Sequence, residues 1–448
     1  MGTTPLYALG IKFHDSNGTK YRSLVIIATE FNSIFAFDAE TRDQVWKTSL
    51  TIGRVVNSND IPAVATRLGG PCDDIKPYYG ITSTPVIDPK TDTVYVILNA
   101  LDLATGKHRD GSPTAPVKAS RAFPNGPLPN NITTFVAIKQ HQRPGLALHE
   151  DQVYTAFGSH CDRPPYLPFL FAFDAKTLAI NSFWTSPVLL SRFNQTNPSF
   201  GPVEGGGPTV WMGGTAPTIF RDKLYVVTGR GPVDVANQGF GNAILRFPLD
   251  LSAVEDYFTP ANGVFLDNTD LDLGSNLGGY VPDGNNSNVF EVINPVPLNS
   301  TNPTGQSIYS GPAYWPGSGG QVFILGRRSN QALYRYAWDS AAQILSPSFA
   351  AQAEKAIGSF SARASNPVVQ AVSADSSEAV LWEIDEQSSL LAWDAMTLKL
   401  LYYSHNTATC GGTPSSQGGV VKFHLVTIAD GHMYLGCGER VLVYGLPT

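Results

Sequence analysis

The sequence predicts an all-β fold, because one short strand–turn–strand cassette returns along the whole chain. In its clearest copy, SIFAFDAETRDQVWKTSL at 33–50, four apolar residues lead into Asp38 and Ala39, a short polar turn follows, and a second strand reaches Trp46. Further copies lie at 101–106, 171–177, 245–250, 333–339, 391–397 and, as a strand without its turn, 441–446. Seven copies through 448 residues indicate an internally repeated fold.

Apolar runs of strand length surround each copy and are bounded by Gly, Pro, Asn and Asp, as is typical of strands. In chain order, the expected strands are 5–13, 23–29, 33–38 and 44–49; 80–88 and 93–99; 143–148, 152–158 and 169–174; 211–220, 223–229 and 242–250; 310–316, 321–326 and 333–338; 366–372, 379–384 and 390–393; and 422–428, 432–436 and 440–444. Each group supplies up to four strands, which is one blade of a β-propeller. We predict a single propeller domain over residues 1–448, with four-stranded blades, closed by its N- and C-terminal strands. Seven blades fit the copies best, and six or eight stay open because 256–300 matches the unit poorly.

The charge pattern argues against two classes of partner. Charged residues make up 15% of the chain, the net charge is −7, and no basic stripe is present. Nucleic acids and anionic membrane surfaces are therefore not expected as partners. No apolar run approaches the roughly 20 residues that span a bilayer, so we expect no membrane span.

Sequons and cysteines favour the secretory pathway. Five acceptor sequons, which predict N-glycans, begin at Asn17, Asn131, Asn194, Asn285 and Asn299. The four cysteines can form two disulfides, and of the three connectivities we prefer Cys72–Cys161 and Cys410–Cys437. We expect an extracellular or secretory-pathway protein whose signal peptide precedes this numbering; the alternative is a cytosolic protein with chance sequons and free thiols.

Several segments, among them PLYALG, GITSTPVIDPKTDTVYV, LDLATGK and GGVVKFHLVTIADGHMYLG, resemble the secreted quinoprotein-like (pyrroloquinoline-quinone-like) propellers. The resemblance runs nearly end to end and implies the propeller fold. Quinone-dependent alcohol dehydrogenases of this type hold their cofactor under a disulfide between adjacent cysteines, beside a Ca²⁺ ion. This chain has no adjacent cysteines and no Cys-x-x-Cys-His haem motif, so we expect neither cofactor nor metal.

A smaller branch of these propellers suggests the activity. The chain is similar in size, repeats and sequons to the fungal hetero-Diels–Alderases of tropolone sesquiterpenoid biosynthesis. That resemblance implies dehydration of a hydroxymethyl tropolone to a quinone methide, followed by intermolecular cycloaddition to a humulene-type alkene. Two alternatives stay open: a quinone- and Ca²⁺-dependent alcohol or sugar dehydrogenase, and a propeller that only binds a glycan or a protein.

The candidate site follows from aligning the units, since residues around the start of each innermost strand line one mouth of a propeller channel. The predicted substrate-binding residues are Thr82, His141, Trp211, Met212, Thr215, Tyr309, Tyr314, Trp315, Asn366 and Phe423. Arg143 or Lys422 can stabilise an enolate-like oxygen, and His160, His141 or His424 can act as acid or base. The acidic loop at 270–288 matches no calcium-binding spacing, so we predict no metal site there.

Overall fold

The computed structural model describes residues 3–15, 18–51, 54–60, 75, 77–97, 99–109, 112, 117–123, 132–160, 166–186, 207–231, 233–259, 311–325, 333–342, 344–346, 348, 350–353, 366–385, 389–404, 425–437 and 440–445. The chain divides into two compact units, an N-terminal unit of residues 2–270 and a C-terminal unit of residues 271–448.

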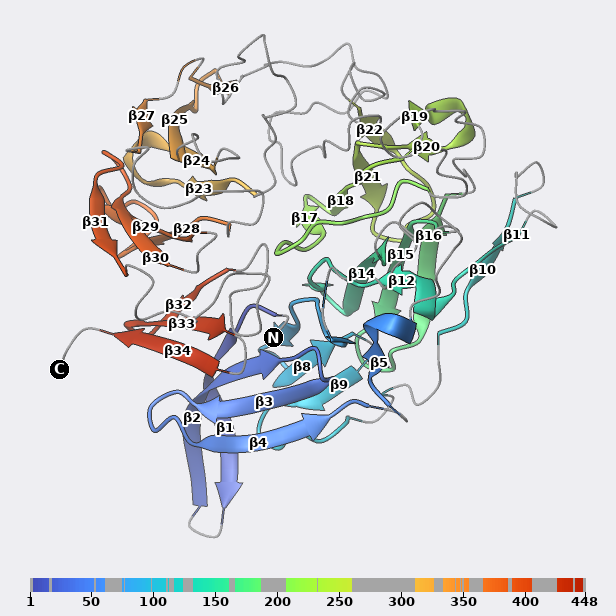
Figure 1. The fold of residues 1–448 in the computed structure, drawn as a ribbon, viewed down its shortest axis with the longest axis horizontal. Coiled ribbons are helices and arrows are strands. Elements are labelled where there is room, and N and C mark those ends of the chain that lie inside the picture. Colours follow the sequence, from blue (N-terminus) through green and yellow to red (C-terminus); the bar gives the residue numbers. More distant parts are fainter. Residues whose placement is uncertain are drawn as a thin grey trace. The chain divides into compact units, whose positions relative to one another are not determined.

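The N-terminal unit contains four antiparallel blades (Figure 1). Blade 1 is β1 (Leu6–Asp15), β2 (Gly18–Ala28), β3 (Ser33–Asp38) and β4 (Gln44–Ser49), and blade 2 is β7 (Val86–Asp88), β8 (Thr93–Val96) and β9 (Asn99–Asp102). Blade 3 is β12 (Gln140–His141), β13 (Ala147–His149), β14 (Gln152–Ser159), β15 (Phe169–Asp174) and β16 (Ile180–Thr185). Blade 4 is β17 (Thr218–Phe220), β18 (Lys223–Val227), β21 (Ile244–Pro248) and β22 (Asp256–Phe258). Short pairs join β5 (Val56–Asn57) to β6 (Tyr78–Tyr79), β10 (Ser120–Ala122) to β11 (Ile132–Thr134), and β19 (Val233–Asp234) to β20 (Gly239–Phe240).

The C-terminal unit contains three blades. Blade 5 is β23 (Ala313–Trp315), β24 (Gln321–Leu325), β25 (Leu333–Asp339), β26 (Ile344–Leu345) and β27 (Ala351–Gln352). Blade 6 is β28 (Val368–Ala371), β29 (Ala379–Ile384), β30 (Leu390–Asp394) and β31 (Leu400–Tyr403), and blade 7 is β32 (Thr427–Ala429), β33 (His432–Cys437) and β34 (Arg440–Gly445). Helix is confined, among the described residues, to single 3₁₀ turns such as Ala137–Lys139. The predicted all-β fold, a seven-bladed propeller, is confirmed; closure by the terminal strands and a single domain stay predictions.

Every copy of the sequence cassette forms the third strand of a blade: β3, β9, β15, β21, β25, β30 and β34. The spacing recurs from copy to copy because of the aspartate that ends the strand. In blade 3, Oδ1 of Asp174 accepts the backbone N–H groups of Lys176 and Thr177 at 3.0 and 2.7 Å and the Thr177 hydroxyl at 2.8 Å. Such Asx turns satisfy backbone donors that the turn would otherwise leave to water.

The same turn recurs with small changes in blades 1, 2, 5 and 6. Asp394 repeats all three bonds, Asp102 binds the N–H and hydroxyl of Thr105, and Asp38 and Asp339 each accept two backbone N–H groups. The fourth residue after Asp38, Asp102, Asp174 and Asp394 has a left-handed backbone, and it is Arg42, Gly106, Leu178 and Leu398 in turn. A short polar turn is thus closed by one carboxylate and one left-handed residue.

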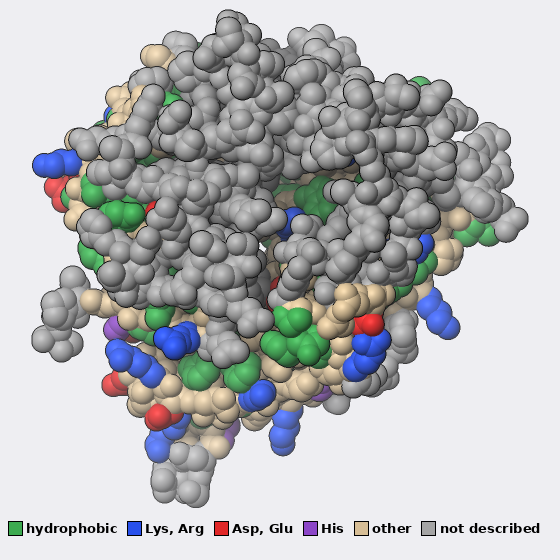
Figure 2. Space-filling model, viewed as in Figure 1, with side chains coloured by type: hydrophobic (Ala, Val, Ile, Leu, Met, Phe, Trp, Pro, Cys, Tyr) green, Lys and Arg blue, Asp and Glu red, His purple; other side chains and the backbone are tan. Residues whose placement is uncertain are grey.

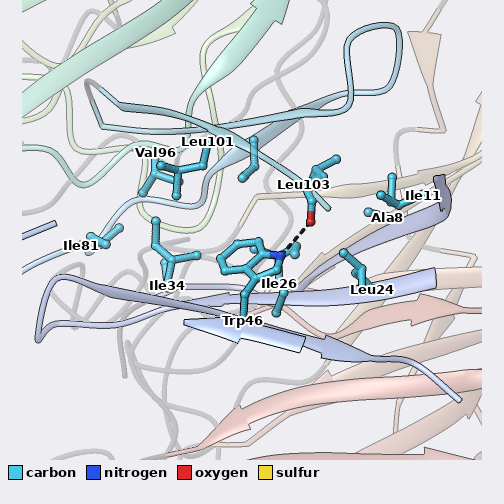
Figure 3. Close-up of a cluster of buried hydrophobic side chains, with 13 residues drawn as sticks. Ala8, Ile11, Leu24, Ile26, Ile34, Trp46, Ile81, Val96, Leu101 and Leu103 are labelled. Carbon is cyan, nitrogen blue, oxygen red and sulfur yellow. Dashed lines mark hydrogen bonds between the residues drawn. The ribbon is translucent and has the colours of Figure 1, made fainter. Parts of the chain in front are cut away.

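Neighbouring blades are joined by tryptophans of the outer strands. In blade 1, the Trp46 indole packs between the β-sheets of blades 1 and 2 and donates to the carbonyl of Leu103 at 2.7 Å (Figure 3). A Cβ at Gly106 would lie 2.6 Å from the Trp46 ring, so the blade 2 turn needs glycine both for its φ of 68° and for this contact. In blade 3, Trp184 packs against Phe247 of blade 4 with ring centroids 5.1 Å apart.

The remaining sequence expectations meet the structure only in part. Cys437 on β33 is disulfide-bonded, but Cys72, Cys161 and Cys410 lie outside the described residues, so both pairings stay predictions. The five sequon asparagines also lie outside them. In the part of the chain that the structure describes, no helix is long and apolar enough to cross a membrane. On the face in Figure 2, the coloured Lys and Arg side chains are scattered among other residues.

The turn geometry predicts that Asp174→Ala lowers the free energy of unfolding by about 2 kcal/mol, because three hydrogen bonds to one carboxylate oxygen are lost. Asp174→Asn keeps an acceptor oxygen and should cost less than about 1 kcal/mol. Urea denaturation of both variants measures the difference. An Asp174→Ala variant as stable as wild type would show that the carboxylate does not hold the turn.

Candidate functional site

The predicted site residues divide between the two units. Thr82, His141, Arg143, His160, Trp211, Met212 and Thr215 belong to the N-terminal unit, and Tyr314, Trp315 and Asn366 belong to the C-terminal unit. Tyr309, Lys422, Phe423 and His424 lie outside the described residues. The N-terminal set is brought together in space, as follows.

A stacked histidine pair lies at the start of blade 3. His141 on β12 pairs with Gly158 of β14, which brings it beside His160, just past the end of β14. The two imidazole rings stack with centroids 4.8 Å apart and an angle of 15° between their planes. The ring of Tyr79 meets both edge-on, at 5.8 Å from His141 and 4.6 Å from His160. All three side chains are buried, so each imidazole has a fixed orientation.

A buried glutamate reaches this pair through a hydroxyl group. Oε2 of Glu30, which follows β2, accepts the N–H of Gly80 at 2.8 Å and the hydroxyl of Thr82 at 3.2 Å. Oγ1 of Thr82 is in turn 3.0 Å from Nε2 of His141. The backbone oxygen of Glu30 would lie 2.2 Å from a Cβ at position 80, so glycine there permits the close approach. Glu30, Thr82 and His141 thus form a chain of hydrogen bonds.

Burial sets the ionisation of this chain. Burial, with smaller contributions from His160 and Arg143, lowers the pKa of His141 well below its usual value, so that imidazole is neutral at pH 7. Burial raises the pKa of Glu30, while the hydrogen bonds from Gly80 and Thr82 oppose the rise. The two groups are therefore closer in proton affinity than a free glutamate and a free histidine, which favours proton transfer between them.

A cation lies over an aromatic face next to the pair. The guanidinium carbon of Arg143 is 5.7 Å from the ring centroid of Trp211, a cation–π contact. Backbone bonds fix the two segments to each other, because Pro144 pairs with Gly213 and the N–H of Gly145 donates to Thr215 at 2.8 Å. Both side chains are only partly buried, so the surface they share can meet a ligand.

Two glycines make room for the Trp211 ring. A Cβ at Gly229 would lie 2.4 Å from Cδ1 of Trp211, and one at Gly158 would lie 3.1 Å from Cε3. Met212 and Thr215 support this loop: the buried Met212 sulfur accepts the N–H of Val227 at 3.4 Å, and the Thr215 hydroxyl donates to the carbonyl of Met212 at 3.3 Å. Met212 thus serves the core, and Trp211 offers the aromatic surface.

Gln142, between His141 and Arg143, is a polar residue that the sequence reasoning did not single out. Gln142 is 8% exposed, and in the part of the chain that the structure describes neither amide atom has a hydrogen-bond partner. A buried amide that lacks partners is expected to meet water or a ligand. Glu30 and Tyr79 were also missed, since nothing in the sequence next to either residue indicates that they meet His141.

The predicted residues of the C-terminal unit have different surroundings. Trp315 is 2% exposed and packs in the core of blades 5 and 6 with Phe323 and Trp393. The adjacent Tyr314 is exposed, and Oδ1 of the buried Asn366 accepts the N–H of Gly311 at 2.6 Å. The alternation along β23 therefore puts Trp315 into the core and leaves Tyr314 as the aromatic ring available to a ligand.

A second buried acid lies in blade 6. Glu383 on β29 is 1% exposed, and its Oε1 accepts the indole N–H of Trp393 at 2.7 Å. Burial raises its pKa to about 8; the Trp393 hydrogen bond lowers it and the charge of Asp385 raises it. Among the described residues, no group of three or more His, Cys, Asp or Glu side chains is placed to hold a metal ion.

The Trp211 slot predicts that Gly229→Ala destabilises the protein by about 1–3 kcal/mol, because the new methyl overlaps the indole. The control is Gly145→Ala, whose Cβ would sit at an ordinary 3.4 Å from its nearest neighbour. In a Trp211→Ala background, Gly229→Ala should leave the stability almost unchanged. Thermal denaturation of wild type, the two single variants and the double variant measures this as a double-mutant cycle. An equal loss of stability from Gly229→Ala in both backgrounds would show that the new methyl does not act through Trp211.

Glu383 predicts a pH-dependent stability. Between its unfolded value of 4.5 and its folded value of about 8, the unfolded state releases a proton that the folded state keeps, so stability falls as pH rises through this window. Glu383→Gln keeps an acceptor for Trp393 without this loss and should gain on the order of 2 kcal/mol over wild type between pH 5 and pH 8. Thermal midpoints of wild type and Glu383→Gln across this pH range measure the gain. Glu378→Gln, at an exposed glutamate, is the control. A gain that does not change with pH would contradict a neutral Glu383.

Comparison with known proteins supports the fold. No protein-family model matches the chain, and no curated protein matches it. The quinohemoprotein alcohol dehydrogenase of Comamonas testosteroni is similar over 97% of this chain and 73% of its own, with a TM-score of 0.52 and 14% identity. Quinohemoprotein alcohol dehydrogenase ADHIIG of Pseudomonas putida HK5 matches at a TM-score of 0.49 and 12% identity, over 97% of this chain and 72% of its own. The first of these likenesses is consistent with the propeller fold described above.

Proposed function

We propose that this protein is a cofactor-independent enzyme that dehydrates a hydroxymethyl tropolone and directs the cycloaddition of the resulting quinone methide to a humulene-type alkene. The observation that supports it most is the Arg143 guanidinium over the Trp211 ring, since Arg143 is two positions along the chain from the buried imidazole of His141. A planar tropolone carries ring oxygens that share negative charge. A cation above an indole face offers such a ring both stacking and charge-assisted hydrogen bonds.

The dehydration needs only proton transfer. A base takes the proton of a ring hydroxyl, electrons move through the ring, and the hydroxymethyl oxygen leaves with a proton as water. His141 is neutral at pH 7 and can take the first proton, because burial lowers its pKa. Arg143 stabilises the negative charge that develops on the ring oxygen. The reaction changes no oxidation state overall, so it requires no redox partner.

The cycloaddition then needs orientation rather than further chemistry. The ring oxygen and the exocyclic carbon of the quinone methide form two new bonds to the alkene. Holding both reactants in one geometry and excluding water can lower the barrier by several kcal/mol. Trp211 gives the flat ring a fixed plane, and the slot between Gly158 and Gly229 fixes Trp211.

The likeness to quinohemoprotein dehydrogenases favours a second candidate, a quinone-dependent dehydrogenase. The residues of this chain do not fit that cofactor well. The sequence has no adjacent cysteines to cover a quinone. A propeller that only binds a ligand is the third possibility. We also propose that the protein is secreted with N-glycans at the five sequons.

The test is a product assay with secreted protein, a hydroxymethyl tropolone and a humulene-type alcohol, followed by chiral chromatography with mass detection. We expect one stereoisomer, formed faster than without protein and without added metal or quinone. Arg143→Met should slow its formation about 100-fold, and Arg143→Lys less. The control Arg221→Met removes a guanidinium that lies 5.0 Å from the exposed Phe220 ring and should change nothing.

The outcome separates the candidates. A racemic adduct at the background rate would contradict the cycloaddition. Dye reduction with an added alcohol, quinone and Ca²⁺ would instead identify the dehydrogenase. If the protein shows neither activity, the binding propeller is the remaining candidate.

A further inference from the structure

We propose that Glu30, Thr82 and His141 form a proton relay, in which Thr82 and Glu30 are positioning residues that fix the tautomer of His141 and take up the proton it receives. The inference rests on the proposed function, because the relay supplies the base for the dehydration. The relay joins residues 52 and 59 positions apart in sequence, which the propeller brings together. None of the three sequence segments indicates it alone.

The hydrogen bonds determine the tautomer. Thr82 has one hydroxyl hydrogen, and it is donated to Oε2 of Glu30 at 3.2 Å. Oγ1 of Thr82 must then act as acceptor toward Nε2 of His141 at 3.0 Å, so the hydrogen of the neutral imidazole lies on Nε2. Nδ1 is left with the lone pair, and Nδ1 is the nitrogen that can accept a proton from a ligand hydroxyl.

The surroundings hold the imidazole in this role. His160 covers one face of the ring at 4.8 Å, and Tyr79 meets it edge-on at 5.8 Å. The titratable and charged groups that act on His141 are Glu30 through Thr82, Tyr79, His160 and Arg143. His160 and Arg143 both disfavour a positive charge on His141. A proton that arrives at Nδ1 is therefore better passed on than kept.

The relay balances as three linked proton transfers. When Nδ1 of His141 takes a proton from the ligand hydroxyl, the Nε2 proton moves to Oγ1 of Thr82 and the Thr82 hydrogen moves to Oε2 of Glu30. The products are a neutral His141 with hydrogen on Nδ1 and a protonated Glu30, so no charge remains on the imidazole. Burial, which raises the pKa of Glu30, favours this end state. The reverse transfer returns the proton to the departing hydroxyl, and water leaves.

The other carboxylate oxygen supports a transferable proton on Glu30. Oε1 of Glu30 is buried and has no hydrogen-bond partner among the described residues, and Glu30 is only 7% exposed. A permanently ionised carboxylate in such a place would be costly. A carboxyl that gains and loses a proton during turnover avoids that cost for part of the cycle.

The test uses the tautomer, which can be read without substrate. Selective ¹⁵N labelling of the eight histidines gives a simple spectrum, in which His141→Asn identifies the His141 signals. Wild type should show His141 as the Nε2–H tautomer. Thr82→Val removes the hydroxyl at nearly constant shape, and it should give a tautomer mixture and lower kcat about 10–100-fold with little change in KM. Glu30→Gln should keep the tautomer largely intact but lower kcat to a similar extent and shift the acidic limb of the pH profile.

Two controls separate the relay from a structural effect. Thr82→Ser restores the hydroxyl and should keep both the tautomer and most of kcat. Ser83→Ala removes a neighbouring buried hydroxyl for which no described residue is a hydrogen-bond partner, and it should behave as wild type. A Thr82→Val variant with an unchanged tautomer, or with unchanged kcat in an active enzyme, overturns the relay and leaves the proposed function standing. A protein without product formation whose tautomer depends on Thr82 overturns the function and keeps the relay geometry.

Discussion

The hydrogen bonds that one aspartate accepts after the third strand of blades 1, 2, 3, 5 and 6 are the constraint on which the rest of the structure depends. In a four-stranded blade the third strand must end, and the chain must turn within about four residues and return as the outer strand. The carboxylates of Asp38, Asp102, Asp174 and Asp394 make that turn possible, because each accepts two or three donors that a tight turn exposes. In the same turns the N–H of the residue after the aspartate bonds back toward the preceding hairpin, as from Ala175 to Asp151. The turn therefore fixes three strands at once.

Once the hairpins are fixed, the ends of the inner strands are fixed as well, and these ends carry the candidate site. His141 and His160 come from β12 and the end of β14, two strands that pair directly. Trp211 lies before β17 and is held by Gly158 and Gly229 from two different blades. Glu30 lies in the turn between β2 and β3 of blade 1, and Thr82 lies in the segment that leads into β7 of blade 2. A rigid scaffold thus places the Arg143 cation, the Trp211 ring and the hydrogen-bonded chain from Glu30 to His141 within the N-terminal unit.

The sequence predicted the fold well because the turn signal is local. An aspartate, a small residue and a threonine at fixed spacing determine the backbone without help from distant residues, and the seven copies then determine the number of blades. The candidate site was predicted in part for the same reason, since the start of an inner strand can be read from the repeat. Glu30 was missed because its partner Thr82 lies 52 residues away, and nothing in the run SLVIIATE shows that its carboxyl turns inward. The burial of Trp315 depends on the packing of blade 5 against blade 6, which no local pattern reports.

The most direct test of the central claim is a crystal structure of the secreted protein with bound tropolone, an unreactive core of the proposed substrate. The account predicts a tropolone ring stacked on Trp211, with its oxygens within hydrogen-bond distance of the Arg143 guanidinium. It also predicts His141 Nδ1 on the ligand side of the imidazole. A tropolone ordered elsewhere, with Arg143 and Trp211 as they are here, would contradict the assignment of this site.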